Sequence, residues 1–193
     1  MLKQMIDRES GTQPAGFETI ATHKERGVII AEIAAPPMNL LGPEVVRDLV
    51  FLIQQVETDD SVHVLVFKSA DPGYFISHVD VTRIGEYRDL ATKLSGEPSL
   101  AMLFRYLSAS RLITIAQIEG RVRGVGSEFV LACDMRFAAL ESAVFGLPEV
   151  GFGLIPGAGA AQHLTRLMGR GRALEALLSA EDYHAQDRAA PAE

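Results

Sequence analysis

The sequence predicts a single α/β domain in which buried strands alternate with amphipathic helices. Residues 62–67 and 112–118 are apolar at almost every position, which is typical of strands covered on both faces. Each of these segments follows one with apolar residues at helical spacing. The chain has 193 residues, 48% hydrophobic and 22% charged, which is an ordinary composition for one folded domain.

The first elements predicted along the chain are a β-hairpin and a helix. Residues 17–22 and 27–34 are rich in strand-forming residues and are separated by the charged residues 23–26. Pro36 and Pro37 end the second strand. A helix begins at Pro43, with Glu44 beside its positive end, and its apolar face holds Val46, Leu49, Val50 and Ile53.

The second half of the chain continues the alternation. A second helix is expected from Pro98, with an apolar stripe of Leu100, Leu103, Phe104 and Leu107. Residues 87–96 are polar and without a strong period, so we expect an exposed, mobile loop there. A short helix over 124–132, a strand over 135–140 and two helices over 157–168 and 172–180 follow, with the last two separated by Gly169, Arg170 and Gly171.

Charge and cysteine content narrow the partners and the compartment. With 18 Lys and Arg against 25 Asp and Glu, the formal net charge is −7, which disfavours nucleic acid and anionic membranes as partners. Cys133 is the single cysteine, so no internal disulfide is expected. Residues 1–16 are polar and carry no signal peptide, and no membrane span is present. We therefore expect a soluble, cytoplasmic protein with a mobile leader over 1–16 and one domain over 17–193.

Most common catalytic patterns are absent. The sequence has no His-Glu-x-x-His, no Cys-x-x-Cys, no phosphate-binding Gly-x-x-x-x-Gly-Lys-Ser/Thr and no Gly-x-Ser-x-Gly. The five histidines have no ligand spacing, so no metal site is expected. Phe129 stands where a dinucleotide-binding motif needs its third glycine, which disfavours that class.

Residues 118–129 are the most informative segment. A buried strand runs through Gly120, Gly124 and Gly126 into a helix start, where unpaired N–H groups can hold an anion or a developing oxyanion. Glu128 lies in the first turn of that helix, where it is either catalytic or simply stabilised by the helix dipole. Glu149 lies between apolar neighbours after Pro148, and is either a functional acid or a surface glutamate.

Four segments together resemble the crotonase, or enoyl-CoA hydratase/isomerase, superfamily over residues 17 to about 190. They are Pro37-Met38-Asn39-Leu40-Leu41, Phe75-Ile76-Ser77-His78-Val79-Asp80, residues 124–128 with Ala132-Cys133-Asp134, and residues 145–149 continuing through 153–159. The resemblance implies a spiral of ββα turns that binds acyl-coenzyme A thioesters. It also implies a homo-oligomer, a trimer or a dimer of trimers, and no cofactor besides the coenzyme A thioester substrate.

The same resemblance implies the site residues. The backbone N–H groups of Val79 and Val125 fall on the oxyanion hole, and Glu128 and Glu149 on the two acid positions of the hydratases. The substrate-binding positions that match are Met38, Leu40, Ile76, Ser77, His78 and Gly124.

Two acids suit the addition of water to a 2-enoyl thioester, a reaction of fatty acid metabolism. One carboxylate deprotonates the attacking water, a proton reaches the α-carbon, and two N–H donors stabilise the enolate oxygen. We expect Glu128 to hold the water as base and Glu149 to donate the proton, with its pKa raised by apolar neighbours such as Phe145, Leu147 and Val150. The alternatives are isomerisation, thioester hydrolysis, decarboxylation, and binding of acyl-CoA or a partner without turnover.

Three features depart from the family pattern. His78 and Val125 stand where glycine is usual, so less room is left for the substrate. Histidine tolerates positive φ, so we expect His78 to keep the bend that glycine would form. After residue 185 the resemblance fades, and we expect a chain truncated before the family's C-terminal helices, with Leu174, Leu177 and Leu178 exposed or covered by another copy.

Overall fold

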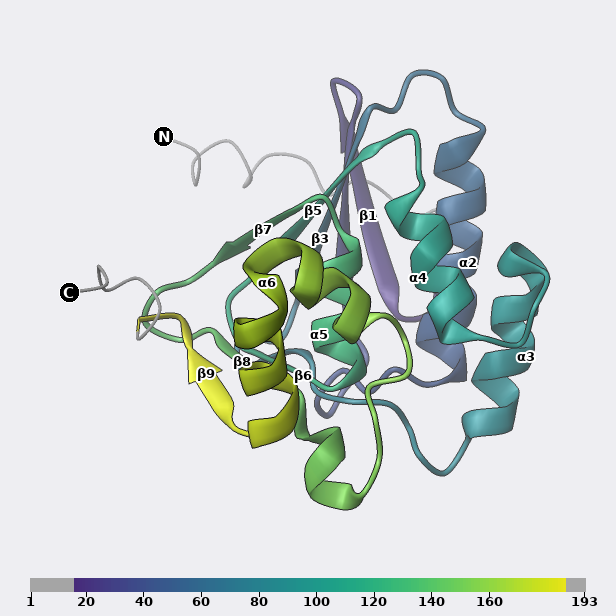
Figure 1. Ribbon diagram of the computed structural model, residues 1–193. Helices are drawn as coiled ribbons and strands as arrows, with labels where there is room; N and C mark the ends of the chain where they lie inside the picture. Colours follow the sequence, from purple (N-terminus) through teal and green to yellow (C-terminus); the bar gives the residue numbers. More distant parts are fainter. Residues whose placement is uncertain (1–15, 187–193) are drawn as a thin grey trace.

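The computed structural model describes residues 16–186, which form two β-sheets with helices packed around them (Figure 1). Except for Gly16, the predicted leader over 1–16 lies outside these residues. The larger sheet has the order β1-β2-β3-β5-β7. Its strands are β1 (Ile20–Glu25), β2 (Val28–Ile33), β3 (Val64–Ser69), β5 (Ile113–Ile118) and β7 (Met135–Ala138).

The smaller sheet has the order β4-β6-β8-β9. Its strands are β4 (Tyr74–Ile76), β6 (Arg121–Arg123), β8 (Val144–Gly146) and β9 (Asp182–His184). Three successive sections of the chain each give one strand to each sheet, as β3 and β4, then β5 and β6, then β7 and β8. Strands from successive sections pair in parallel, and Val66 of β3 lies between Ile30 and Ile115. This repetition confirms the predicted α/β fold built from turns of two strands and a helix.

The first hairpin is confirmed, but its first strand lies three residues later in the chain than expected. Strands β1 and β2 are antiparallel, and Glu25 pairs with Val28. The turn consists of Arg26 and Gly27 at φ 46° and 82°, a pair of positive angles typical of tight hairpins. The charged residues before this turn therefore belong to the strand, where their side chains are exposed.

Two predicted amphipathic helices are confirmed as α2 (Pro43–Glu57) and α4 (Leu100–Ser108). Pro43 occupies the first turn of α2, where its missing N–H costs no hydrogen bond. The second helix starts two residues later than expected, because the Ser99 side chain accepts a hydrogen bond from the Met102 amide and caps it.

The expected mobile loop over 87–96 is wrong, because residues 87–95 belong to helix α3 (Ile84–Ser95). Tyr87 and Ala91 are one helical turn apart and both are buried. The helix packs against α2 and α4 and ends at Gly96, whose φ is 78° (Figure 1). A buried stripe this narrow leaves little periodicity in the sequence, so tertiary contact stabilises a helix that the pattern did not reveal.

The remaining helices position the site. They are α5 (Val125–Ala132), the short 3₁₀ helix η1 (Pro148–Phe152) and α6 (Ala160–Ser179). The backbone of Gly169, at φ 79° and ψ 164°, interrupts α6, which confirms the predicted division into two helices. None of the helices within residues 16–186 is long and apolar enough to cross a membrane.

Phe129 of α5 is at the centre of the core. Its ring lies 4.9 Å from that of Phe67 in β3 and 5.6 Å from that of Phe104 in α4, both in edge-on geometry. Phe75 of β4 approaches it at 6.4 Å. The residue that disfavoured a dinucleotide site is thus a packing residue that fixes α5 between both sheets and α4.

Candidate active site

A cavity of about 870 Å³ opens where the end of β4, the start of α5 and the segment around η1 meet. Both predicted acids, Glu128 and Glu149, line it. So do Val79 and Val125, whose amides are the predicted oxyanion donors. The structure therefore brings together four residues separated by up to 70 positions in the sequence.

Leu41 holds the Val79 segment in an extended conformation. The Leu41 amide donates to the His78 carbonyl at 2.9 Å, and the Asp80 amide donates to the Leu41 carbonyl at 3.1 Å. Successive amides of an extended chain point in opposite directions, so the Val79 N–H takes part in neither bond.

The side-chain amide of Asn39 holds this arrangement in place. Its amide nitrogen donates to Ser69 Oγ at 2.7 Å and to the carbonyls of Tyr74 and Phe75, while its oxygen accepts from the Ala35 amide. The Ser77 hydroxyl also donates to the Met38 carbonyl at 2.8 Å. Residues 37–41 thus position the first predicted oxyanion segment by hydrogen bonding to it.

The second predicted donor, Val125, is the first residue of α5. First-turn amides have no acceptor within their own helix, so this N–H is available to a ligand. A Cβ at Gly126 would lie 2.1 Å from the Ile76 carbonyl oxygen, which means that only glycine lets α5 start directly against β4. That close approach brings the two predicted donors to the same cavity.

Glu128 is buried, with 3% of its surface exposed. Its Oε1 accepts from the amides of Ala158 at 2.7 Å and Ala160 at 3.1 Å, at the N-terminal end of α6. Burial raises the pKa of Glu128 to about 7, and the nearby Glu149 acts in the same direction, while the two amide bonds oppose the shift. Near neutral pH this carboxyl can therefore both accept and release a proton.

Glu149 is half-buried on η1, the turn that Pro148 begins. A Cβ at Gly124 would lie 3.0 Å from its Oε1, so the carboxyl rests against the first glycine of the α5 start. Its Oε2 is buried and has no hydrogen-bond partner within the described residues. Burial raises the pKa of Glu149, and the positive charge of Arg123 works against that shift.

His78 and Val125 both line the cavity, but His78 does not keep the expected bend. The described non-glycine residues with positive φ are Arg26, Asn39 and Ala180, so the prediction for His78 is wrong. Because Leu41 holds this segment extended, no left-handed residue is needed. The imidazole is exposed, with Nδ1 2.7 Å from the Val79 carbonyl oxygen.

The predicted substrate-binding residues fall into two groups. Ser77, His78 and Gly124 line the cavity, whereas Met38, Leu40 and Ile76 are not among its lining residues. Ile76 has no exposed surface. Met38 and Leu40 contribute backbone carbonyls to the turn before α2, through bonds from Ser77 and Gly42.

Two parts of the site were missed by sequence reasoning. The Ala158 and Ala160 amides hold Glu128, and a helix start after a glycine-rich segment was their signal in the sequence. Arg123 also lines the cavity, and its positive charge lowers the pKa of Glu149. Its position next to Gly124 carried no such signal, because strand arginines usually face solvent.

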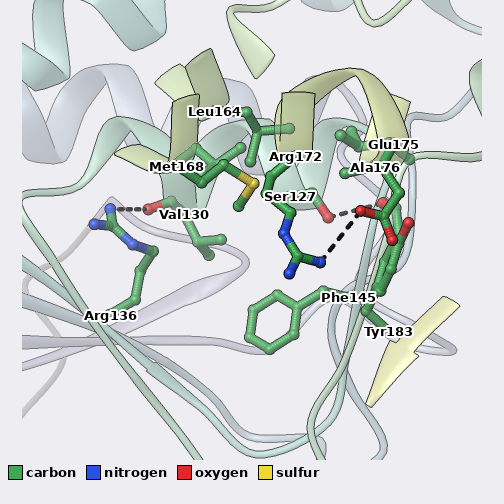
Figure 2. A pocket seen from close by; sticks show the side chains of 13 residues that line it. Ser127, Val130, Arg136, Phe145, Leu164, Met168, Arg172, Glu175, Ala176 and Tyr183 are labelled. Carbon is green, nitrogen blue, oxygen red and sulfur yellow. Dashed lines mark hydrogen bonds and ion pairs between the residues drawn. The ribbon is translucent and has the colours of Figure 1, made fainter. Parts of the chain in front are cut away.

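A second cavity, of about 420 Å³, lies on the other side of α5, between α6 and the small sheet. Figure 2 shows Leu164 and Met168 of α6 above Phe145, with Arg136 and Glu175 at opposite ends. Neither Glu128 nor Glu149 lines this cavity. Within residues 16–186 no group of three or more His, Cys, Asp or Glu is arranged to hold a metal ion.

Comparisons with known proteins agree on one family. The family model described as Enoyl-CoA hydratase/isomerase matches residues 23–190. The "Probable enoyl-CoA hydratase 2, mitochondrial" of Arabidopsis thaliana is 36% identical over 149 residues, which is 76% of this chain and 48% of that protein. The "Short-chain-enoyl-CoA hydratase" of Clostridium acetobutylicum is 29% identical over 172 residues, covering 89% of this chain and 65% of that protein.

Solved structures show the same likeness. A crystal structure of a protein described as a candidate enoyl-CoA hydratase from Streptomyces avermitilis superposes with a TM-score of 0.86 and 53% identity. The superposition covers 90% of this chain and 63% of that one. The chain therefore spans between 48% and 65% of the length of these three proteins.

Proposed function

The chain belongs to the enoyl-CoA hydratase/isomerase family, and from that premise we propose that it hydrates 2-enoyl-CoA thioesters to 3-hydroxyacyl-CoA. One observation carries the proposal: Glu128 and Glu149 line the same cavity as Val79 and Val125. The relatives named as enoyl-CoA hydratases support the same reaction. A homo-oligomer and a cytoplasmic location stay predictions from the sequence.

In the proposed reaction the thioester carbonyl oxygen accepts hydrogen bonds from the Val79 and Val125 amides. These donors stabilise the negative charge that the oxygen gains as the enolate forms, and one such donor contributes about 3 kcal/mol. Val125 also has its side chain at the cavity, with 5% of its surface exposed, so the space beside the carbonyl is narrower than glycine would leave.

The two acids divide the proton transfers. Glu128, in its ionised form, takes a proton from the water that attacks the β-carbon, and its pKa of about 7 suits a base that works near neutral pH. Glu149 delivers a proton to the α-carbon. Its burial favours the protonated form that a donor needs, and its unpartnered Oε2 leaves the proton free of competing acceptors.

The test is hydration of crotonyl-CoA by the purified protein, followed by loss of the conjugated thioester absorbance. We expect turnover in the native protein, and a fall of about 100-fold or more in both Glu128→Gln and Glu149→Gln. Glu141→Gln, which changes an exposed glutamate, is the matched control and keeps the native rate.

The outcomes separate the alternatives. Equal rates in all four proteins would remove the two-acid mechanism. Tight binding of an acyl-CoA without turnover by the native protein would favour a binding protein of the same fold. Turnover of a 3-enoyl-CoA, but not of crotonyl-CoA, would move the reaction to isomerisation.

A further inference from the structure

Resting on the proposed function, we propose that Arg123 is a positioning residue for the Glu149 carboxylate, and that Asp182 holds the Arg123 guanidinium in place. The three residues come from β6, η1 and β9, so the arrangement connects the last described strand of the chain to the cavity. No sequence motif indicated this pair of residues.

Arg123 is one of three residues that pair side by side across the small sheet. Arg123 of β6 pairs with Gly146 of β8, and Gly146 pairs with Asp182 of β9. Side chains of directly paired residues point to the same face of a sheet, so those of Arg123 and Asp182 flank Gly146. Because residue 146 has no side chain, they meet above it, with Arg123 Nε 2.9 Å from Asp182 Oδ1.

Any larger residue at 146 would break this pair. A Cβ there would lie 2.6 Å from Asp182 Oδ1 and 3.4 Å from Arg123 Nε. The Nε atom is buried and makes no well-directed hydrogen bond, so the contact is an ion pair set by packing. Each side chain is a little over one-third exposed, at 38% and 36%, which leaves part of the guanidinium outside the pair.

Arg123, Gly124 and Glu149 line the same cavity. Glu149 Oε1 rests against Gly124, the residue that follows Arg123, and the Gly124 amide donates to the Gly146 carbonyl at 2.9 Å. The positive charge of Arg123 lowers the pKa of Glu149 against the effect of burial.

Other charged side chains also lie around Glu149. Glu128 of α5 lines the same cavity, and the charge of Glu149 raises the pKa of Glu128. Asp182 reaches Arg123 from β9, and His78 and Arg88 lie elsewhere on the cavity wall. Helix α6 packs against η1 but contributes none of the cavity lining. Arg123 is thus the cation whose charge acts on Glu149 from the adjacent strand.

This cation has a defined use in the proposed reaction. When Glu149 gives its proton to the α-carbon, it becomes a carboxylate in a half-buried place. A fixed positive charge beside it stabilises that carboxylate and lowers the cost of the transfer. Without Arg123, Glu149 would hold its proton more tightly.

The experiment is a direct titration of Glu149 by NMR in protein labelled with ¹³C at glutamate carboxyls, with the signal assigned by its loss in Glu149→Gln. In Arg123→Met we expect the midpoint to rise by about one pH unit, and kcat for crotonyl-CoA to fall about tenfold with KM within about twofold. Arg123→Lys keeps the charge and returns the midpoint most of the way to native. Asp182→Asn frees the guanidinium to move away from Glu149, so we expect an intermediate rise in the midpoint, although the loss of a nearby negative charge by itself lowers it.

Arg121→Met is the matched control. Arg121 lies on the same strand, is exposed, and has its guanidinium 5.8 Å from the centre of the Tyr74 ring. Its loss removes the same charge from β6 without touching Glu149, so the midpoint stays native. Arg123→Gln, which can still hydrogen-bond to Asp182, is the second neutral variant if the methionine protein does not fold.

The results distinguish a failure of the inference about Arg123 from a failure of the proposed function. A Glu149 midpoint that is unchanged in Arg123→Met and Arg123→Gln overturns the inference, even if both acids prove essential for turnover. A native or lowered midpoint in Asp182→Asn overturns the anchoring role of Asp182, because the guanidinium then stays near Glu149 without it. A raised midpoint in a protein that turns over no enoyl-CoA supports the positioning role and removes the proposed function instead.

Discussion

Glu128 shows how one side chain depends on segments far from it in the sequence. Its side chain is buried and belongs to α5, but its hydrogen bonds come from amides thirty and thirty-two positions later, at the start of α6. Burial disfavours the charged form and the helix start favours it, and burial has the larger effect. The residue type was evident from the sequence, while the balance of these two effects was not.

This balance makes stability depend on pH. In the unfolded chain Glu128 has its ordinary pKa of 4.5, and in the folded protein about 7. The stabilisation is complete below pH 4.5 and is lost as pH rises to about 7, because the unfolded chain releases its proton first. Across this window we expect the free energy of unfolding of the native protein to fall by up to about 3 kcal/mol. Glu128→Gln has no group that titrates at this position, so its free energy of unfolding does not show this decrease.

Urea unfolding of the native protein and Glu128→Gln at several pH values between 4 and 8 measures this difference. Glu141→Gln changes an exposed glutamate and serves as control, with a curve parallel to the native one. If the native and Glu128→Gln curves are also parallel, the burial of the carboxyl has no such energetic effect.

At the scale of the elements, α5 links the core to the cavity. Glu128 lines the cavity, and Phe129, about 100° further round the helix, packs against aromatic rings from β3, β4 and α4. The same eight residues therefore determine both the packing of the two sheets and the position of one acid.

We expect Phe129→Ala to lower the free energy of unfolding by about 4 kcal/mol, because it leaves a cavity among three rings. Phe137, in β7, is 59% exposed, and Phe137→Ala is the matched control with a change within about 0.5 kcal/mol. Urea unfolding with linear extrapolation measures both. Similar losses in the two variants would contradict the central position of Phe129.

At the scale of the molecule, Asn39 connects the two sheets. It is buried at φ 51°, and its side-chain nitrogen donates to Ser69 of β3 in one sheet and to the Tyr74 and Phe75 carbonyls of β4 in the other. Asparagine suits this place because it tolerates the left-handed region and supplies both donors and an acceptor.

We expect Asn39→Ala to lower the free energy of unfolding by about 3 kcal/mol, since it leaves buried polar groups without partners and places at positive φ a residue that tolerates this region less well than asparagine does. Asn39→Gly removes the same hydrogen bonds without that strain, so it should lose about 1 kcal/mol less. Equal stability of the alanine variant and the native protein in urea unfolding would show that the sheets are held without this side chain.

Most of the elements were predictable where local pattern and tertiary role agree. The apolar faces of α2 and α4 carry enough buried residues to show a helical period, and the glycines around residue 170 mark a break in any helix. Helix α3 buries just Tyr87 and Ala91, so its period is too weak to read. The three-residue strands of the small sheet are too short for alternation to be recognised.

The sequence by itself determined the alternation of strands and helices and which acids to consider, because hydrophobic period and residue type are local properties. Only the tertiary structure decided that Glu128 and Glu149 share a cavity, that α6 amides hold one of them, and that Asp182 meets Arg123 over Gly146. These relations depend on strand order and on the close approach of backbones, which no short stretch of sequence specifies.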